Sequence, residues 1–244
     1  MITAFAERRI ARTLLIDADD TLWENNIFYL RCTADFLDLV DALGFNRVEA
    51  QRTLDHCEQE VIPILGYGPK GYVAALELAC QRLHERAGRA ASADLLTQVR
   101  RLGEPVLHPP MVLLPEVELT LQILRLASRL VLVTKGDEAA QRAKIARSGL
   151  EPLFDAVYIV PEKNVAAYRR IADELQLDRG ATWMVGNSPK SDINPAIECG
   201  LGAILIPHDH TWTAEHEEIA QPDKVTILER FADLPRYFGI EEVA

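Results

Sequence analysis

Five short apolar runs recur along the chain, and each of them ends at polar or turn-forming residues. Runs of this kind are typical of strands that are buried on both faces of a parallel sheet. Segments with a helical period separate the last four runs, which is the alternation expected of strand–helix–strand units. The predicted strands are Thr13–Ile16, Leu130–Val133, Ala156–Val160, Thr182–Val185 and Ala203–Ile206.

The segments between the last four runs predict helices over Glu138–Ser148, Val165–Leu175 and Ile193–Cys199. Gly149 follows the first of them and Gly200 the third, and glycine commonly ends a helix. The pattern therefore predicts an α/β fold with a Rossmann-like parallel sheet core, helices on both faces and right-handed crossovers.

The long interval between the first two runs contains no convincing strand. Its apolar positions follow a helical period, with breaks at Gly44, at residues 66–69 and at Pro109-Pro110. We therefore expect an all-helical cap subdomain at residues 22–115, inserted into a core of residues 1–21 and 116–244. The tail from Ala214 is expected to pack on the core as a helix with extended pieces. The predicted cap helices are Ile27–Leu43, Arg47–Val61, Tyr72–Ala87 and Ala93–Leu102.

Composition narrows the choice of partners. The chain has 244 residues, of which 48% are hydrophobic, and its net charge of −11 disfavours binding to nucleic acid or to a membrane surface.

No signal peptide or membrane span is predicted. Cys32, Cys57, Cys80 and Cys199 lack metal-ligand spacing, and the first three are predicted to be buried thiols. We expect a cytoplasmic monomer or homodimer that acts on a small molecule.

The candidate chemistry follows the predicted strands. Sites in open parallel sheets form beyond the carboxyl ends of the strands. The residues found there supply carboxylates, a hydroxyl, an amide and an ammonium group, which together suit a cation and a phosphoryl group. The four segments are residues 17–21, 134–136, 161–163 and 186–192.

Two of these carboxylates have distinct tasks. Asp17, directly after the first strand, can attack phosphorus and form an acyl phosphate. Asp19, two residues later, can protonate the leaving oxygen and afterwards take a proton from water. Two carboxylates that face a phosphate dianion repel it, so we expect a hard divalent cation, Mg²⁺ by default, to neutralise them.

The remaining groups suit the phosphoryl oxygens. Thr134 offers a hydroxyl, and the backbone amides of Lys135 and Gly136 offer further donors, whereas the Lys135 side chain is expected to face outward. Lys163 supplies a fixed positive charge that stabilises the group being transferred.

Four segments together resemble the motifs of the haloacid dehalogenase (HAD) superfamily. DADDT at residues 17–21 resembles its first motif, DxDxT, and Thr134 and Lys163 resemble the second and third. GNSPKSD at residues 186–192 resembles the fourth, usually written GDxxxxD. The order and spacing match over about residues 12–207. The resemblance implies a magnesium-dependent phosphomonoesterase with a helical cap, acting on a small phosphorylated metabolite.

One position departs from the family pattern. Asn187 stands where the family usually has the first Asp of the fourth motif. Its carbonyl oxygen can still bind a metal, but the site loses one negative charge. The resemblance leaves Asp17, Asp192 and the backbone carbonyl of Asp19 around the metal. We therefore expect Mg²⁺ to bind more weakly.

Three features outside the motifs are secondary candidates. The glycine-rich segment 66–72 is either a plain connector or a substrate-contacting loop in which Lys70 or a tyrosine touches the leaving group. Trp23 falls where the resemblance implies a hinged flap, and either packs in the core or contacts substrate. His208-Asp209-His210 gives a weak indication of a second metal site, because polar loops at strand ends produce such runs by chance.

Alternative functions remain open. A phosphomutase would need its cap to exclude water more strictly. A 2-haloacid dehalogenase shares the fold but has no use for an acid at Asp19. A binding protein that has lost turnover is suggested by Asn187. Hydrolysis of a chromogenic phosphate ester with and without Mg²⁺ discriminates among these.

Overall fold

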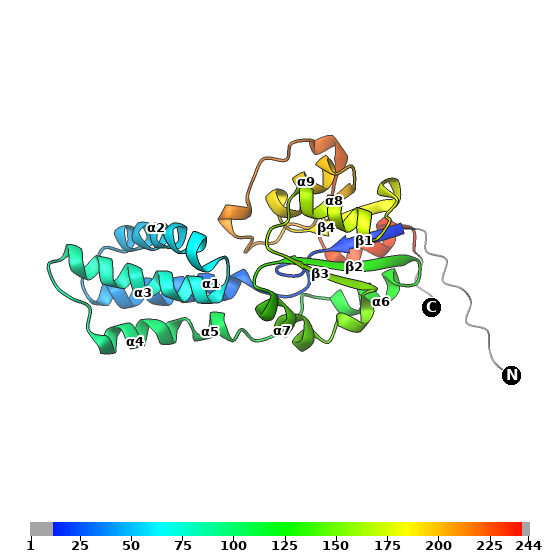
Figure 1. Cartoon of the computed structure of the whole chain (residues 1–244). Coiled ribbons are helices and arrows are strands. Elements are labelled where there is room, and N and C mark those ends of the chain that lie inside the picture. The colour runs from blue at the N-terminus through cyan, green and yellow to red at the C-terminus, as the bar shows by residue number, and fades with distance from the viewer. Residues whose placement is uncertain (1–11, 241–244) are drawn as a thin grey trace. The chain divides into compact units, whose positions relative to one another are not determined.

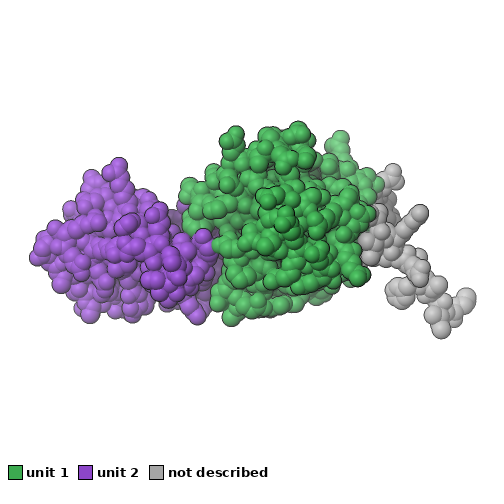
Figure 2. Space-filling model, turned by 45° about the horizontal axis from the view of Figure 1, so that its top comes forward, with its two compact units in different colours: residues 1–24, 111–244 green, residues 25–110 purple. Residues whose placement is uncertain are grey.

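The computed structural model describes residues 12–240, so the expectations about a signal peptide and the last four residues of the tail lie largely outside it. The chain divides into two compact units, each with its own hydrophobic core. One unit comprises the chain up to Glu24 and from Met111 onward, and the other comprises Asn25–Pro110 (Figure 2). Within the described range, no helix has the length and apolarity that crossing a bilayer requires.

The first unit is built on a six-stranded parallel sheet with the strand order β3-β2-β1-β4-β5-β6 (Figure 1). The predicted α/β class and Rossmann-like core are confirmed. The sixth strand is not predicted by the sequence pattern, because it is a short edge strand whose residues are only partly buried. The strands are β1 (Arg12–Ile16), β2 (Ser128–Lys135), β3 (Ala156–Val160), β4 (Thr182–Gly186), β5 (Gly202–Leu205) and β6 (Val225–Ile227).

Helices cover both faces of this sheet, because successive side chains of a strand point to opposite faces. Leu14 and Ile16 of β1 share a cluster with α6 (Val117–Leu124), α7 (Glu138–Ser148) and the short α10 (Leu234–Tyr237). Leu15, between them, packs in a second cluster with α8 (Val165–Glu174) and α9 (Asn194–Glu198). The central strand β1 is therefore buried on both faces, and this packing fixes its carboxyl end, where Asp17 follows.

The second unit is all-helical, and its core takes up the apolar stripe of each long helix. Asn46 and Ser92 cap the amino ends of the second and fourth helices by accepting backbone N–H bonds. Cys32, Cys57 and Cys80 are buried free thiols, as predicted. The helices are α1 (Asn26–Ala42), α2 (Arg47–Leu65), α3 (Pro69–Arg86), α4 (Ala93–Leu102) and the short α5 (Glu104–Leu107).

The two segments that lead into and out of the helical unit, residues 22–24 and 112–114, pair with each other within the first unit. Glu24 N–H donates to the Val112 carbonyl (2.9 Å), and Leu114 N–H donates to the Leu22 carbonyl (2.9 Å). Trp23 is buried in the same core cluster, against which Leu113 packs. The core unit thus includes residues 22–24 and 111–115, which the sequence analysis assigned to the cap, because their apolar side chains complete the core.

Candidate active site

Three of the predicted motifs meet at the carboxyl edge of the sheet. Lys163, in the loop after β3, donates to Asp17 Oδ1 (2.5 Å), directly after β1, and to Asp192, after β4. All three residues are at most 5% exposed. The structure therefore brings a buried ammonium group and two buried carboxylates into direct contact.

The backbone fixes both carboxylates. Asp17 N–H donates to the Val185 carbonyl (2.9 Å), which extends the pairing of β1 with β4 by one residue. Asp192 Oδ2 accepts the Ser188 N–H (3.0 Å), which anchors the carboxylate to the loop that follows β4. A Cβ on Gly186 would overlap the Asp192 carboxylate, so only glycine fits at that strand end.

Burial governs the charge state of this cluster. It raises the pKa of Asp17 to about 7, and Asp192 adds to that shift although Lys163 opposes it. Burial by itself would lower the pKa of Lys163, but the two carboxylates hold it well above its ordinary value. Two carboxylates facing one ammonium group leave a net negative charge, which favours a further cation.

The oxygen atoms at this edge fit a hard divalent cation. Thr21 Oγ1 donates to Asp17 Oδ2 (3.0 Å) and lies 3.4 Å from Asn187 Oδ1. Asn187 Nδ2 donates to Thr211 Oγ1 (2.8 Å), which turns the amide so that its oxygen faces the Asp17 side. Carboxylate and carbonyl oxygens are the ligands that Mg²⁺ prefers. The donor set around Asp17 therefore fits this ion despite the Asn at position 187.

Asp19 is held by side chains from two directions. Its carboxylate accepts from Trp23 Nε1 (2.7 Å), from Gln141 Nε2 (2.9 Å), and from Lys144 Nζ at both oxygens (2.8 and 2.7 Å). Burial alone would raise the pKa of Asp19, but the charge and hydrogen bond of Lys144, together with the hydrogen bonds from Gln141 and Trp23, lower it. Asp19 is thus an ionised, firmly held group in this structure.

Sequence reasoning missed Gln141 and Lys144. Their spacing of three on the predicted helix after the second strand places them on one helix face, which is the signal that could have found them. Nothing in the spacing alone indicates that this face points toward Asp19.

Trp23 and Lys70 are the two remaining residues that the sequence predicts as substrate contacts. The structure corrects the interpretation of Trp23, because its side chain is 1% exposed and its indole supports Asp19 instead of facing a ligand. Lys70 is exposed in the first turn of α3, in the helical unit.

The end of β2 also differs from expectation. Thr134 is buried near the end of the strand. Gly136 N–H, however, donates to the Val160 carbonyl (3.0 Å), so this predicted phosphoryl donor is already committed to the backbone. The Lys135 side chain faces inward and donates to Glu215 Oε1 (2.5 Å) and Ser191 Oγ (3.1 Å), which corrects the outward orientation predicted for it.

Glu215 joins three segments that are far apart in sequence. Besides Lys135, its carboxylate accepts the hydroxyls of Ser188 (2.6 Å) and Ser191. Burial would raise the pKa of Glu215, but Lys135 and the hydroxyl donors lower it to about 2. Glu215 therefore ties the segment after β5 to the loop that carries Asn187 and Asp192, although no sequence signal links it to them.

The ion pair of Glu215 with Lys135 predicts a contribution to the unfolding free energy that is lost in acid. Because folding lowers the pKa of Glu215 from 4.5 to about 2, its contribution is present above about pH 5 and is lost as the pH falls toward 2. Glu215→Gln should cost up to about 3 kcal/mol of unfolding free energy at pH 7. Urea unfolding at several pH values measures this. The difference in unfolding free energy between wild type and Glu215→Gln should shrink as the pH falls. A difference that stays constant with pH would contradict the prediction, and so would an equal loss in the exposed control Glu218→Gln.

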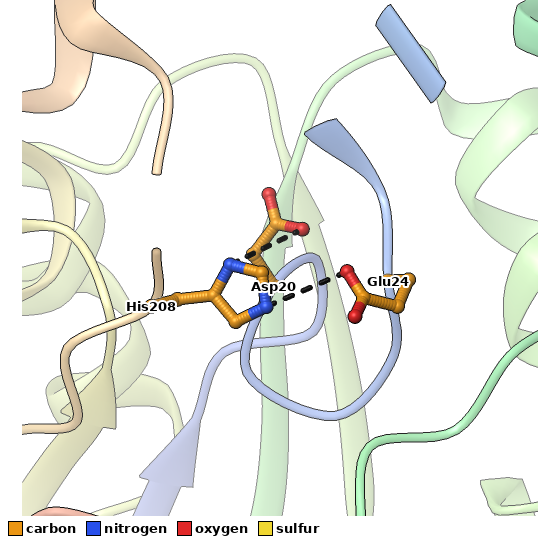
Figure 3. Close-up of side chains that lie close together, drawn as sticks. All are labelled: Asp20, Glu24 and His208. Atoms are coloured by element: carbon orange, nitrogen blue, oxygen red, sulfur yellow. Dashed lines mark ion pairs between the residues drawn. The ribbon is translucent and has the colours of Figure 1, made fainter. Parts of the chain in front are cut away.

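A separate cluster braces the turn after β1. His208 Nδ1 lies 3.9 Å from Asp20, and its Nε2 lies 3.5 Å from Glu24 (Figure 3). Potential ligand atoms of these residues lie within 4.8 Å of one another. Each carboxylate faces a different ring nitrogen, which is the arrangement of an imidazole held between two acids. The His208-Asp209-His210 run thus contributes one side chain to a cluster whose other members come from the turn.

Comparisons with known proteins agree with this geometry. The model of one family, described as haloacid dehalogenase-like hydrolase, matches residues 11–200. N-acylneuraminate-9-phosphatase of Mus musculus is 29% identical over 130 residues, which are 51% of this chain and 52% of that protein. Pyrimidine 5'-nucleotidase YjjG of Escherichia coli is 29% identical over 115 residues, 41% of this chain and 51% of that protein. The chain thus spans about half the length of the curated relatives it matches.

Solved structures match over nearly the whole chain. A haloacid dehalogenase-like family hydrolase from Xanthomonas campestris has a TM-score of 0.79 at 25% identity, over 96% of this chain and 93% of its own. The HAD-hydrolase YfnB of Bacillus subtilis has a TM-score of 0.59 at 20% identity, over 95% of this chain and 100% of its own. The second likeness concerns the fold alone.

Proposed function

Because this chain belongs to the haloacid dehalogenase-like hydrolases, we propose that it is a Mg²⁺-dependent phosphomonoesterase acting on a small phosphorylated metabolite. One observation carries the proposal: Asp17 is buried against Lys163, and a second carboxylate, Asp19, is held two residues away. A nucleophile and an acid–base group at that spacing serve phosphoryl transfer. The phosphatase and nucleotidase names of two relatives support the same class of substrate.

The residues divide the reaction into two displacements. A carboxylate oxygen of Asp17 attacks phosphorus while the bond from phosphorus to the ester oxygen breaks. Asp19, which is ionised in this structure and must first take up a proton from solvent, gives that proton to the ester oxygen. Asp19 then accepts a proton from the water that attacks the phosphoryl group and releases Asp17. Lys163 stays beside Asp17 throughout, where it stabilises the charge that develops on the phosphoryl oxygens. Thr134 is the hydroxyl proposed to bind one of those oxygens.

The proposed Mg²⁺ ligands are Asp17, Asp192, the Asn187 carbonyl oxygen and the backbone carbonyl of Asp19. When bound, the ion neutralises the carboxylates and polarises the phosphoryl group. In this structure Lys163 donates to one oxygen of Asp17 and one of Asp192, and the Ser188 N–H donates to the other Asp192 oxygen, so a bound ion would share these oxygens with their donors. Asp17 Oδ2 and Asn187 Oδ1 both lie within 3.4 Å of Thr21 Oγ1.

The direct test is hydrolysis of p-nitrophenyl phosphate and of a panel of phosphorylated metabolites, with Mg²⁺ and with a chelator. We expect turnover that depends on Mg²⁺ and a preference for one small metabolite. Turnover unaffected by the chelator would overturn the metal requirement. Release of halide from a 2-haloacid, or transfer of phosphoryl between two positions of a substrate without release, would favour the dehalogenase or the phosphomutase instead.

Asn187→Asp tests the metal ligands separately. The added charge should lower the Mg²⁺ concentration needed for half-maximal activity, because charge count tunes the affinity of oxygen sites for hard cations. The measurement is a Mg²⁺ titration of both proteins at fixed substrate and ionic strength, since screening would blur the comparison. A higher or unchanged half-saturation point would mean that Asn187 does not contact the metal or its water shell.

A further inference from the structure

The carboxylate of Asp19 has no lone-pair position left for the proton that a general acid must carry to a leaving group. Oδ1 accepts from Trp23 and Lys144, and Oδ2 accepts from Gln141 and Lys144. A carboxylate has about four acceptor positions, so these bonds use all of them. To meet a leaving group, Asp19 must give up at least one of its donors.

The donors differ in how easily they can move. Trp23 is buried in the core, and Gln141 is only 5% exposed and also donates to the Lys135 carbonyl (2.8 Å) at the end of β2. Lys144 reaches Asp19 from α7 through a flexible four-carbon stem, and its side chain is 12% exposed. Its ammonium group can therefore follow or release a carboxylate oxygen with little change in the surrounding core.

We propose that Lys144 is the positioning residue for Asp19: it fixes the carboxylate against α7 and releases one oxygen, which can then carry the proton that the leaving group accepts. This inference rests on the proposed phosphomonoesterase function. The apolar side of α7 is anchored by the buried Ile145, so the partly buried ion pair of Lys144 with Asp19 is an additional contact of that helix.

The proposal predicts that substitution of Lys144 affects substrates with a poor leaving group more than substrates with a good one. An acid matters most when the departing oxygen is strongly basic and least when it leaves easily. Lys144→Met should therefore lower kcat/KM for glycerol 2-phosphate about 10-fold or more, within the usual range for a positioned acid–base group. The same variant should leave kcat/KM for p-nitrophenyl phosphate within about 3-fold of wild type. A purely structural role would lower both values equally.

A double-mutant cycle tests whether Lys144 acts through Asp19. In an Asp19→Asn background, Lys144→Met should no longer change the ratio of the two kcat/KM values. In the protein that keeps Asp19, Lys144→Arg can still donate to both carboxylate oxygens. Its ratio of the two kcat/KM values should therefore lie between those of Lys144→Met and wild type. Arg142→Met is the matched control, because it removes a cation from an exposed position of the same helix. Thermal unfolding confirms folding, and Lys144→Gln serves if the Met variant is unstable.

The outcomes separate the two proposals. An equal loss for both esters, or a Lys144 effect that persists without Asp19, would overturn the positioning role while the phosphatase function stands. A wild-type protein that hydrolyses neither ester nor any phosphorylated metabolite would overturn the phosphatase function, and the role of Lys144 with it.

Discussion

Asp17→Asn is expected to abolish turnover, by at least about 10⁴-fold, because an amide cannot form the acyl phosphate. The fold should remain intact, since Lys163 keeps its contact with Asp192 and Thr21 can donate to the amide oxygen. Burial raises the pKa of Asp17 to about 7, so the ionised carboxylate costs folding free energy at neutral pH. The Asn variant should therefore unfold at the same temperature as wild type or higher.

Three measurements check this result. Steady-state hydrolysis of p-nitrophenyl phosphate gives the loss of turnover, and thermal unfolding gives the stability. Mass spectrometry after an acid quench should find one phosphoryl group on the peptide containing residue 17 in wild type and none in the variant. Substantial activity in a folded Asp17→Asn protein would exclude covalent catalysis by this residue.

Lys163→Met should have the largest combined effect on stability and activity. Its ammonium group lies between two buried carboxylates, and its side chain is 3% exposed. Removing one partner of a buried ion pair costs about 3–5 kcal/mol, because the remaining charge stays buried without compensation. The pKa of Asp17 should rise further and leave less of the nucleophile ionised. Urea unfolding and kcat/KM of the same preparations measure the two effects.

A second substitution separates these effects. Adding Asp192→Asn removes the excess negative charge while its amide oxygen can still accept the Ser188 N–H. The double variant should regain much of the lost unfolding free energy but little of the activity, since no ammonium group then faces the phosphoryl group. If activity recovered together with stability, Lys163 would be needed for the fold and not for the chemistry.

The sheet and the motif residues can be predicted because local patterns encode them. A strand buried on both faces is a continuous apolar run, and the residue that follows it must lie at the carboxyl edge. This rule places the segments that hold Asp17, Lys163 and Asp192 at that edge, whereas the contacts of Lys163 with the two carboxylates are seen only in the structure. The same rule misses β6, since an edge strand needs no continuous apolar run.

The supporting contacts cannot be predicted in this way. Glu215 reaches Lys135 across a long separation in sequence, and only the packing of the segment after β5 brings them together. Gly136 follows a motif residue and suggests a phosphoryl donor, but the backbone path directs its N–H to Val160. Trp23 reads equally well as a ligand contact or a core residue, and burial decides for the core.

The pairing of the two linkers bears on how such a protein can diverge. Residues 22–24 and 112–114 hydrogen-bond to each other, so the core chain is already closed where Asn25–Pro110 leaves and returns. The entropy of joining two such ends changes only slowly with the length of what lies between them. Helical segments of different size can therefore be gained, lost or exchanged at this point by recombination, while β1 and Asp17 keep their register. Ancestry can then differ between the two units of one chain.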